Sequence, residues 1–99
     1  MSRRVMITGL GAVSGLGLNA HAFWDKLKAG QTAIKPLNPP IEGVKISIGA
    51  TVPDFDPESY FTADELSILD RFSQLAVIAA REAVDDAGLV PGEETLTDA

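Results

Sequence analysis

Cysteine is absent from the 99 residues of this chain, and histidine occurs once, at His21. Without thiols, these residues cannot form disulfides, cysteine-based zinc sites, iron–sulfur clusters or a thiol nucleophile. A single histidine likewise excludes a histidine-rich metal site. Aromatic residues contribute 6% of the composition, hydrophobic residues 45% and charged residues 22%. This mixture is typical of a globular protein, and the length corresponds to one domain or less.

The net charge of −6 hides an asymmetry along the chain. Residues 1–53 carry six basic and two acidic side chains, whereas residues 54–99 carry twelve acidic and two basic ones. An acidic, aromatic-poor second half repels phosphate backbones, so nucleic-acid binding is not expected. The acids are interpreted as a solvated helix face followed by a polar tail.

The stretch from Val5 to Trp24 contains no charged residue. Together with the basic N-terminus and the sequence AHA at 20–22, it imitates a secretory signal. Four glycines between Val5 and Leu18 weaken an apolar helix, and polar residues within the stretch argue against a membrane span. We therefore expect a cytoplasmic protein that does not associate with membranes.

The first third of the chain predicts a strand, a loop and a helix. Residues 4–8 form a short apolar run typical of a strand buried on both faces of a parallel sheet. The glycines that follow, from Gly9 to Gly17, allow positive φ angles and close backbone approach. Asn19 is a candidate N-cap and Gly30 a candidate C-terminal glycine of a helix. Its apolar face, expected to lie in the core, comprises Ala20, Phe23, Trp24 and Leu27.

The remainder predicts one more strand and a helical region. Residues 44–52 alternate between apolar and polar, which is typical of a strand near a sheet edge. Thr62 and Glu65 form a capping box at a helix start, and a helical stripe then continues to Gly88. Asp70 could cap a second start, giving a short helix before a long one. The small residues Ala76, Ala79, Ala80 and Ala83 allow close packing, so the long helix is expected to be packed inside something larger than this chain. Residues 90–99 are expected to be a disordered or truncated tail.

The sequence gives only weak evidence for any catalytic or binding site. A strand, Gly9-x-Gly11 and a helix are parts of a dinucleotide cradle, but Ser14 replaces the third glycine and the helix begins only near Asn19. His21 and Asp25 are helical neighbours that could form a surface pair, and a Ser14-His21-Asp25 set can be named although no spacing demands it. Consecutive acids suit solvation better than acid–base catalysis or calcium binding, and they lie at Asp85, Asp86, Glu93 and Glu94. No catalytic, cofactor-binding or metal-binding residue is assigned.

Three stretches, in order and spacing, resemble the N-terminus of a β-ketoacyl-acyl-carrier-protein synthase. They are RVMITGLG at 4–11 with Ser14 and Gly17, FWDKLKAG at 23–30, and DRFSQLA at 70–76 continuing to AREAVDDAGL at 80–89. The resemblance covers residues 3–89. It implies an α/β fold, the N-terminal portion of a thiolase-like fold with an incomplete first half, so that residues 1–99 form a fragment of the synthase N-terminal domain.

The resemblance also implies a chemistry. In this family a cysteine takes the acyl group, and two histidines assist decarboxylation of the malonyl-carrier so that the carbanion attacks the thioester; a thiolate is both a strong nucleophile and a good acyl leaving group. These groups map beyond Ala99, so no catalytic residue is carried over, no cofactor is expected and this chain alone should be inactive. Implied partners of the full-length acyltransferase are an acyl-carrier protein, malonyl and acyl thioesters, and a second copy in a homodimer.

One departure from the family concerns residues 63–69, where several fatty-acid members place a base that helps hold an acidic carrier. Here the stretch has two acids and no base. A polyketide-type or specialised synthase is therefore as plausible as a fatty-acid elongation enzyme. Two further readings stay open: a non-catalytic remnant or module that docks on a partner chain, and a small nucleotide-binding protein.

Overall fold

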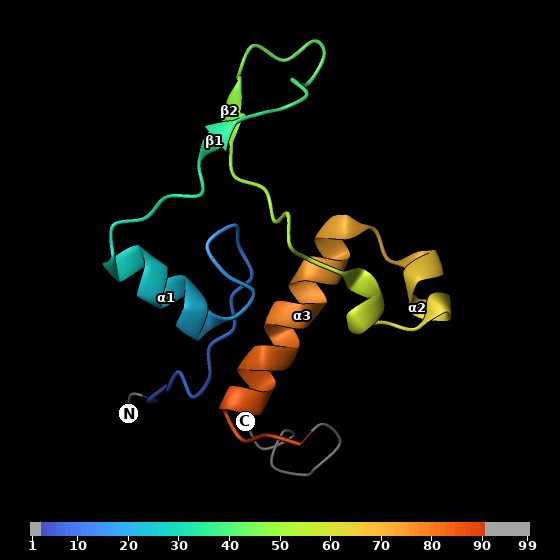
Figure 1. The fold of residues 1–99 in the computed structure, drawn as a ribbon. Helices are drawn as coiled ribbons and strands as arrows, with labels where there is room; N and C mark the ends of the chain where they lie inside the picture. Colours follow the sequence, from blue (N-terminus) through green and yellow to red (C-terminus); the bar gives the residue numbers. More distant parts are fainter. Residues whose placement is uncertain (1–2, 91–99) are drawn as a thin grey trace.

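A computed structural model of the chain describes residues 3–90 (Figure 1). A helix, two very short strands, a 3₁₀ turn and two further helices follow one another along the sequence. Their bounds are α1 Ala20–Lys28, β1 Lys35–Pro36, β2 Ile48–Gly49, η1 Pro57–Ser59, α2 Ala63–Ile68 and α3 Arg71–Asp86. The expected tail and the acids Glu93 and Glu94 lie outside the described residues, apart from Val90 at the start of the tail.

A small core lies around the long helix α3. Its buried apolar side chains are Phe55 and Phe61, which flank η1, and Ile78 in the middle of α3. The Phe55 ring stacks on Tyr60 with centroids 5.5 Å apart. Partly buried apolar side chains pack around them from the N-terminal loop, from the segment before η1, from α2 and its C-cap, and from α3. They are Val13, Leu18, Val52, Leu66, Leu69, Leu75 and Val77. Helix α3 therefore organises this part of the molecule.

The glycine-rich segment runs against the backbone of α3, which confirms the predicted close approach. A Cβ atom added to Gly9 would lie 2.1 Å from the Ala83 carbonyl oxygen. A Cβ atom added to Gly11 would lie 1.8 Å from the Ala79 carbonyl oxygen. Neither separation is possible for real atoms, so glycine is required at both positions. The small side chains of Ala79 and Ala83 leave the room that this contact needs.

Helix α1 begins and ends where the sequence predicted. The Asn19 side-chain oxygen accepts a hydrogen bond from the Ala22 amide at 2.8 Å. At the other end Gly30 adopts a φ of +76°, in the left-handed region that favours glycine. The apolar face is less covered than expected, because no α1 residue is buried and Trp24 is 54% exposed. The prediction that Trp24 lies in the core was wrong: α1 packs on few apolar neighbours among residues 3–90.

The structure resolves the choice between one long helix and two. Helix α2 starts with the predicted capping box, in which Thr62 and Glu65 each bind the other's backbone amide. Leu69 then adopts an extended backbone, and the Asp70 side chain accepts a hydrogen bond from the Ser73 amide to start α3. Helix α3 ends before Gly88, which has a φ of +72°. The second start at Asp70 is therefore confirmed.

The first predicted strand is not formed. Residues 4–8 have no strand assignment, and Val5 is 91% exposed and Ile7 82% exposed. A strand requires a hydrogen-bonded neighbour, and residues 3–90 provide none for this segment. The prediction of a strand buried on both faces was therefore wrong for the chain as described.

The second predicted strand is formed only in part. Within residues 44–52, only β2 has strand geometry, and it pairs antiparallel with β1 so that Lys35 lies opposite Gly49. Residues 31–52 form an arm that projects away from the helices (Figure 1). Most apolar side chains of the arm are exposed, including Ile46 and Ile48. The arm lacks a layer to cover its apolar side, which explains why so little of the alternating segment forms a ladder.

No helix within residues 3–90 is both long enough and apolar enough to cross a membrane.

Candidate functional site

The carboxylate of Glu82 on α3 accepts several hydrogen bonds from distant backbone amides. Its Oε1 atom accepts a hydrogen bond from the Ala12 amide at 2.9 Å. Both oxygens also accept from the amide of Ala20, the first residue of α1, at 3.1 and 2.9 Å. One turn further along, the Asp86 carboxylate accepts from the Leu10 amide at 3.0 Å. Two acids of α3 thus fix the glycine-rich segment and the start of α1.

This arrangement of hydrogen bonds argues against the nucleotide-binding hypothesis. Phosphate cradles use free backbone amides at a loop and at a helix start. Here the amides of Leu10, Ala12 and Ala20 already donate to carboxylates. Glu82 and Asp86 would also repel a phosphate placed beside them. The geometry of the loop therefore opposes a dinucleotide site.

Ser14, His21 and Asp25 do not form a catalytic set. The Ser14 hydroxyl accepts a hydrogen bond from the Leu16 amide, and its backbone closes a tight turn with Gly17. His21 lies 3.2 Å from Asp25 on the open surface of α1, with its side chain 87% exposed. Within the described residues, no hydrogen bond joins Ser14 to His21. His21 and Asp25 form the surface pair that the helical spacing predicted.

An open hollow of about 670 Å³ lies beside Glu82. Apolar and charged side chains from the N-terminal loop, η1 and α3 line it, and they are Leu18, Asn19, Tyr60, Ile78, Arg81, Glu82, Asp85 and Asp86. Acids dominate its charged groups. No group of three or more potential metal-ligating side chains gathers within the part of the chain that the structure describes.

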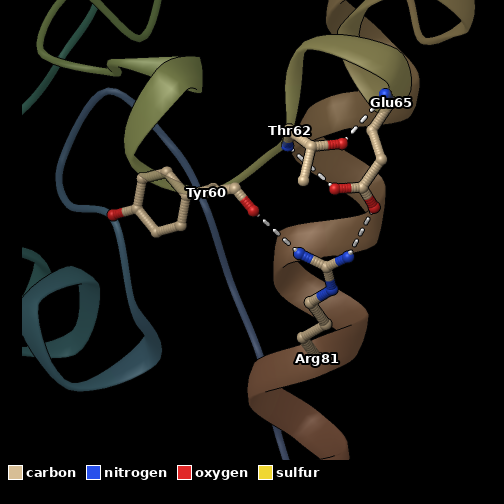
Figure 2. A network of polar contacts seen from close by, with 4 residues as sticks. All are labelled: Tyr60, Thr62, Glu65 and Arg81. Carbon is tan, nitrogen blue, oxygen red and sulfur yellow. Dashed lines mark hydrogen bonds and ion pairs between the residues drawn. The ribbon is translucent and has the colours of Figure 1, made fainter.

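Arg81 joins α3 to α2 and η1 (Figure 2). Its guanidinium donates to the Tyr60 carbonyl oxygen at 3.2 Å and lies 3.4 Å from a Glu65 carboxylate oxygen. It also lies over the Phe61 ring, 5.0 Å from the centroid. The hydrogen bond from the Thr62 amide, with further help from the Thr62 hydroxyl and the charge of Arg81, holds the pKa of Glu65 below its usual value. This network anchors α2 on α3.

Sequence reasoning missed Glu82 as a structural anchor and interpreted Asp86 as an exposed acid. Asp86 is exposed, but it also accepts the hydrogen bond from Leu10. Glu82 lies three positions after Ala79 and directly before Ala83, the alanines against which the glycines pack. Small residues let another stretch of backbone approach this face of the helix, and a carboxylate there can accept hydrogen bonds from its amides. Glu82 beside Ala79 and Ala83 is therefore the signal that could have indicated this role.

The structure resembles part of a solved ketosynthase. A solved structure titled the ishigamide ketosynthase/chain length factor matches with a TM-score of 0.70 and 37% sequence identity, over 89% of this chain and 22% of that one. The profile of the family "Beta-ketoacyl synthase, N-terminal domain" matches residues 2–98. The chain belongs to the β-ketoacyl synthase N-terminal domain family, which confirms the resemblance seen in the sequence.

Curated relatives agree with this assignment. Nodulation protein E of Rhizobium sp. (strain N33) is 43% identical over 90 residues, covering 90% of this chain and 22% of that protein. The 3-oxoacyl-[acyl-carrier-protein] synthase 2 of Coxiella burnetii is 40% identical over 88 residues, covering 88% of this chain and 21% of that protein. A relative from Streptomyces cyaneus, whose name assigns it to polyketide synthesis, is 42% identical over 98 residues, covering 95% of this chain and 22% of that protein. The chain thus spans about a fifth of the length of the relatives it matches.

Proposed function

We propose that residues 1–99 act as the N-terminal segment of a β-ketoacyl-acyl-carrier-protein synthase with a thiolase-like fold. Such an enzyme condenses an acyl thioester with a malonyl-carrier in cytoplasmic fatty acid or polyketide biosynthesis. The observation that carries the proposal is the family match over residues 2–98, with 40% identity to a 3-oxoacyl-[acyl-carrier-protein] synthase. The acyl-accepting cysteine and the two histidines would lie outside these residues.

The role of this segment in the proposed enzyme is that of a scaffold. Glycine-rich residues 9–12 lie on α3, and Glu82 ties them to the start of α1. The apolar residues 5–7 are exposed and lie in no helix or strand, so they are free to supply a strand to a sheet formed with other parts of the enzyme. Acyl transfer tolerates little displacement of its reacting groups, and a rigid scaffold preserves their geometry.

The partners of the proposed enzyme are an acyl-carrier protein, malonyl and acyl thioesters, and a second copy in a homodimer. In helix α2, Asp64 is exposed and Glu65 pairs with Arg81, so this helix presents no free base to an acidic carrier. The carrier would have to find its basic contacts elsewhere on the synthase.

A chimeric enzyme tests the proposal. In the Coxiella synthase, the 88 matching residues would be replaced by their counterparts from this chain, and formation of β-ketoacyl-carrier from labelled malonyl-carrier would be measured. We expect activity within about 100-fold of the intact synthase, the cost of a scaffold misplaced by about 1 Å. The Coxiella synthase without its own N-terminal segment, and this chain alone, serve as controls and should be inactive.

The exposed apolar surface also favours the second hypothesis, a module that docks on a separate polypeptide. Adding this chain in trans to the shortened Coxiella synthase distinguishes the two. Activity restored only in trans supports the docking module. A chimera that folds as a dimer but shows no condensation contradicts the proposed function.

A further inference from the structure

The segment of residues 4–8 has backbone groups that are available to a partner. Within residues 3–90, these five residues are all exposed, lie in no helix or strand and take part in no backbone–backbone hydrogen bond. Val5, Ile7 and Thr8 are β-branched, and such residues favour strand pairing. An unpaired apolar segment of this kind is a template for another strand, so it can accept a strand from a second chain.

Two bases lie at the start of this segment. Arg3 and Arg4 are exposed, and neither forms an ion pair within the described part of the chain. The other two arginines, Arg71 and Arg81, donate to backbone carbonyl oxygens of their own chain at 2.9 and 3.2 Å. Arg3 and Arg4 are therefore the arginines that acids of another molecule can reach.

Acids lie at the other end of the segment, where it meets the last turns of α3 (Figure 1). Gly9 packs against the Ala83 carbonyl oxygen, and the Leu10 amide donates to the Asp86 carboxylate at 3.0 Å. Asp85 and Asp86 are both exposed and line the same open hollow. Asp85 forms no ion pair with any residue from 3 to 90. The segment thus begins with free bases and ends beside free acids.

From this combination we propose that residues 4–8 of two copies of the chain pair as antiparallel strands centred on Met6. In this register Val5 of each copy lies opposite Ile7 of the other, and the two apolar side chains share one face of the pair. Arg3 of each copy lies opposite Gly9 of the other copy, next to the acids at the end of its α3. A second copy supplies both halves of this match at once, as a two-fold symmetric interface requires.

The pairing is a property of residues 1–99 as a separate polypeptide and does not use the proposed condensation activity. In the chimeric synthase, residues 4–8 would instead be covered by other parts of the same enzyme. The chimera assay and the association measurements can therefore fail independently of each other. Few side chains are buried between the two strands, so the dimer should be weak.

Sedimentation equilibrium of the 99-residue chain measures the association directly. We expect a reversible change in mass from 10.4 kDa toward twice that value as the concentration rises through the micromolar range. A two-fold symmetric contact closes on itself, so the mass should level off at two copies. Added salt should weaken the dimer, because the contacts between arginines and acids are exposed to solvent.

Charge reversals separate the proposed contact from the overall charge of the chain. The double variant Arg3→Glu/Arg4→Glu should dimerise roughly tenfold more weakly. The matched control Lys35→Glu/Lys45→Glu makes the same charge change in the arm and should dimerise as the unmodified chain does. Asp85→Arg should also weaken the dimer, but an equal mixture of Asp85→Arg with Arg3→Glu/Arg4→Glu should form mixed dimers, in which every contact again joins opposite charges. All these side chains are exposed, and far-ultraviolet circular dichroism checks that helix content is kept.

Cross-linking locates the centre of the pairing. The chain has no cysteine, so Met6→Cys introduces a single thiol, which lies directly opposite its copy in the proposed register. Opposite residues of antiparallel strands have Cα atoms about 4.5–5.5 Å apart, within the range of a disulfide. Diamide, which takes up the two thiol hydrogens, should cross-link Met6→Cys much faster than Ser47→Cys, a matched variant with an exposed thiol in the arm.

Three results would overturn the proposal. A chain that stays monomeric throughout the micromolar range would exclude the pairing. Equal weakening by the two double variants, or no recovery in the mixture, would show that these arginines and acids do not join the two copies. Cross-linking of Ser47→Cys as fast as that of Met6→Cys would assign the association to another surface.

Discussion

Among the glycines that pack on helix α3, Gly11 is the one where an added Cβ atom would come nearest to the helix. Replacing it by alanine would place a Cβ atom 1.8 Å from the Ala79 carbonyl oxygen, so the N-terminal segment must move away. We expect Gly11→Ala to cost about 1–3 kcal/mol, the usual range for overpacking. Amide hydrogen exchange at Ala12, whose amide donates to Glu82, measures the loss as faster exchange in the ¹⁵N-labelled chain.

Gly30→Ala is the matched control for this substitution. Gly30 has a φ of +76° but has no atom within 4 Å of an added Cβ. Its replacement should cost about 1 kcal/mol through backbone strain and loosen only the end of α1. Unchanged exchange at Ala12 in Gly11→Ala, or equal effects of both substitutions there, would contradict the steric argument.

The same contacts show what residue-level reasoning could and could not predict. Close approach at Gly9 and Gly11 was predictable, because only glycine lacks the Cβ that would block it. The anchoring by Glu82 was not, since it joins residues 70 and 62 positions apart. Trp24 was assigned to the core from its helical spacing, yet spacing says only which face is apolar. Whether that face is covered depends on residues elsewhere.

Among the elements, α2 has a pH dependence that follows from its capping box. The pKa of Glu65 lies below its usual value of 4.5, chiefly because the Thr62 amide donates to the ionised carboxylate. A carboxyl group whose pKa is lowered by folding stabilises the folded form above the unfolded pKa, and this contribution disappears as the pH falls through the folded pKa. We therefore expect the start of α2 to loosen on acidification, with the pKa of Glu65 in carboxyl-carbon NMR spectra lying below 4.5.

Glu65→Gln provides the comparison for the capping box. Glutamine keeps an oxygen that can accept from the Thr62 amide but does not titrate, so the protection of the Thr62 and Glu65 amides should lose its dependence on pH in this range. Other carboxyl groups titrate in both proteins, and the difference between the two isolates Glu65. A Glu65 carboxyl group that titrates at its usual pKa of 4.5, or equal pH dependence of amide protection in both proteins, would refute this account.

Helices were more predictable than strands for a physical reason. Asn19, Gly30, Thr62 and Gly88 act on neighbours within a few positions, so helix ends follow from local sequence. A strand needs a partner, and alternation at 44–52 cannot say where that partner lies. The apolar run at 4–8 has no partner among the described residues, and only two residue pairs of the arm form a ladder.

On the scale of the whole molecule, the chain exposes far more surface than a self-contained protein of its size, and many large apolar side chains are exposed. The chain exposes 8099 Å², whereas a self-contained protein of 10.4 kDa exposes about 5,400 Å². Within residues 3–90 only Phe55, Phe61 and Ile78 are buried apolar side chains. The small and apolar residues along α3 predicted that this helix packs inside a protein larger than this chain. Phe72, which is 73% exposed, agrees with an apolar face that residues 3–90 leave uncovered.

Such a chain should be only marginally stable on its own, since hydrophobic burial must offset a conformational entropy cost of similar size. We expect a broad thermal transition by far-ultraviolet circular dichroism, binding of the dye ANS to exposed apolar surface, and association that increases with concentration. In the chimeric synthase, the same residues should become protected from hydrogen exchange. Val5 and Ile7 should show a large gain, because residues 4–8 lie in no strand here and their amides would enter a ladder there. A sharp, cooperative melt of a monomer at high temperature, without ANS binding, would contradict this prediction.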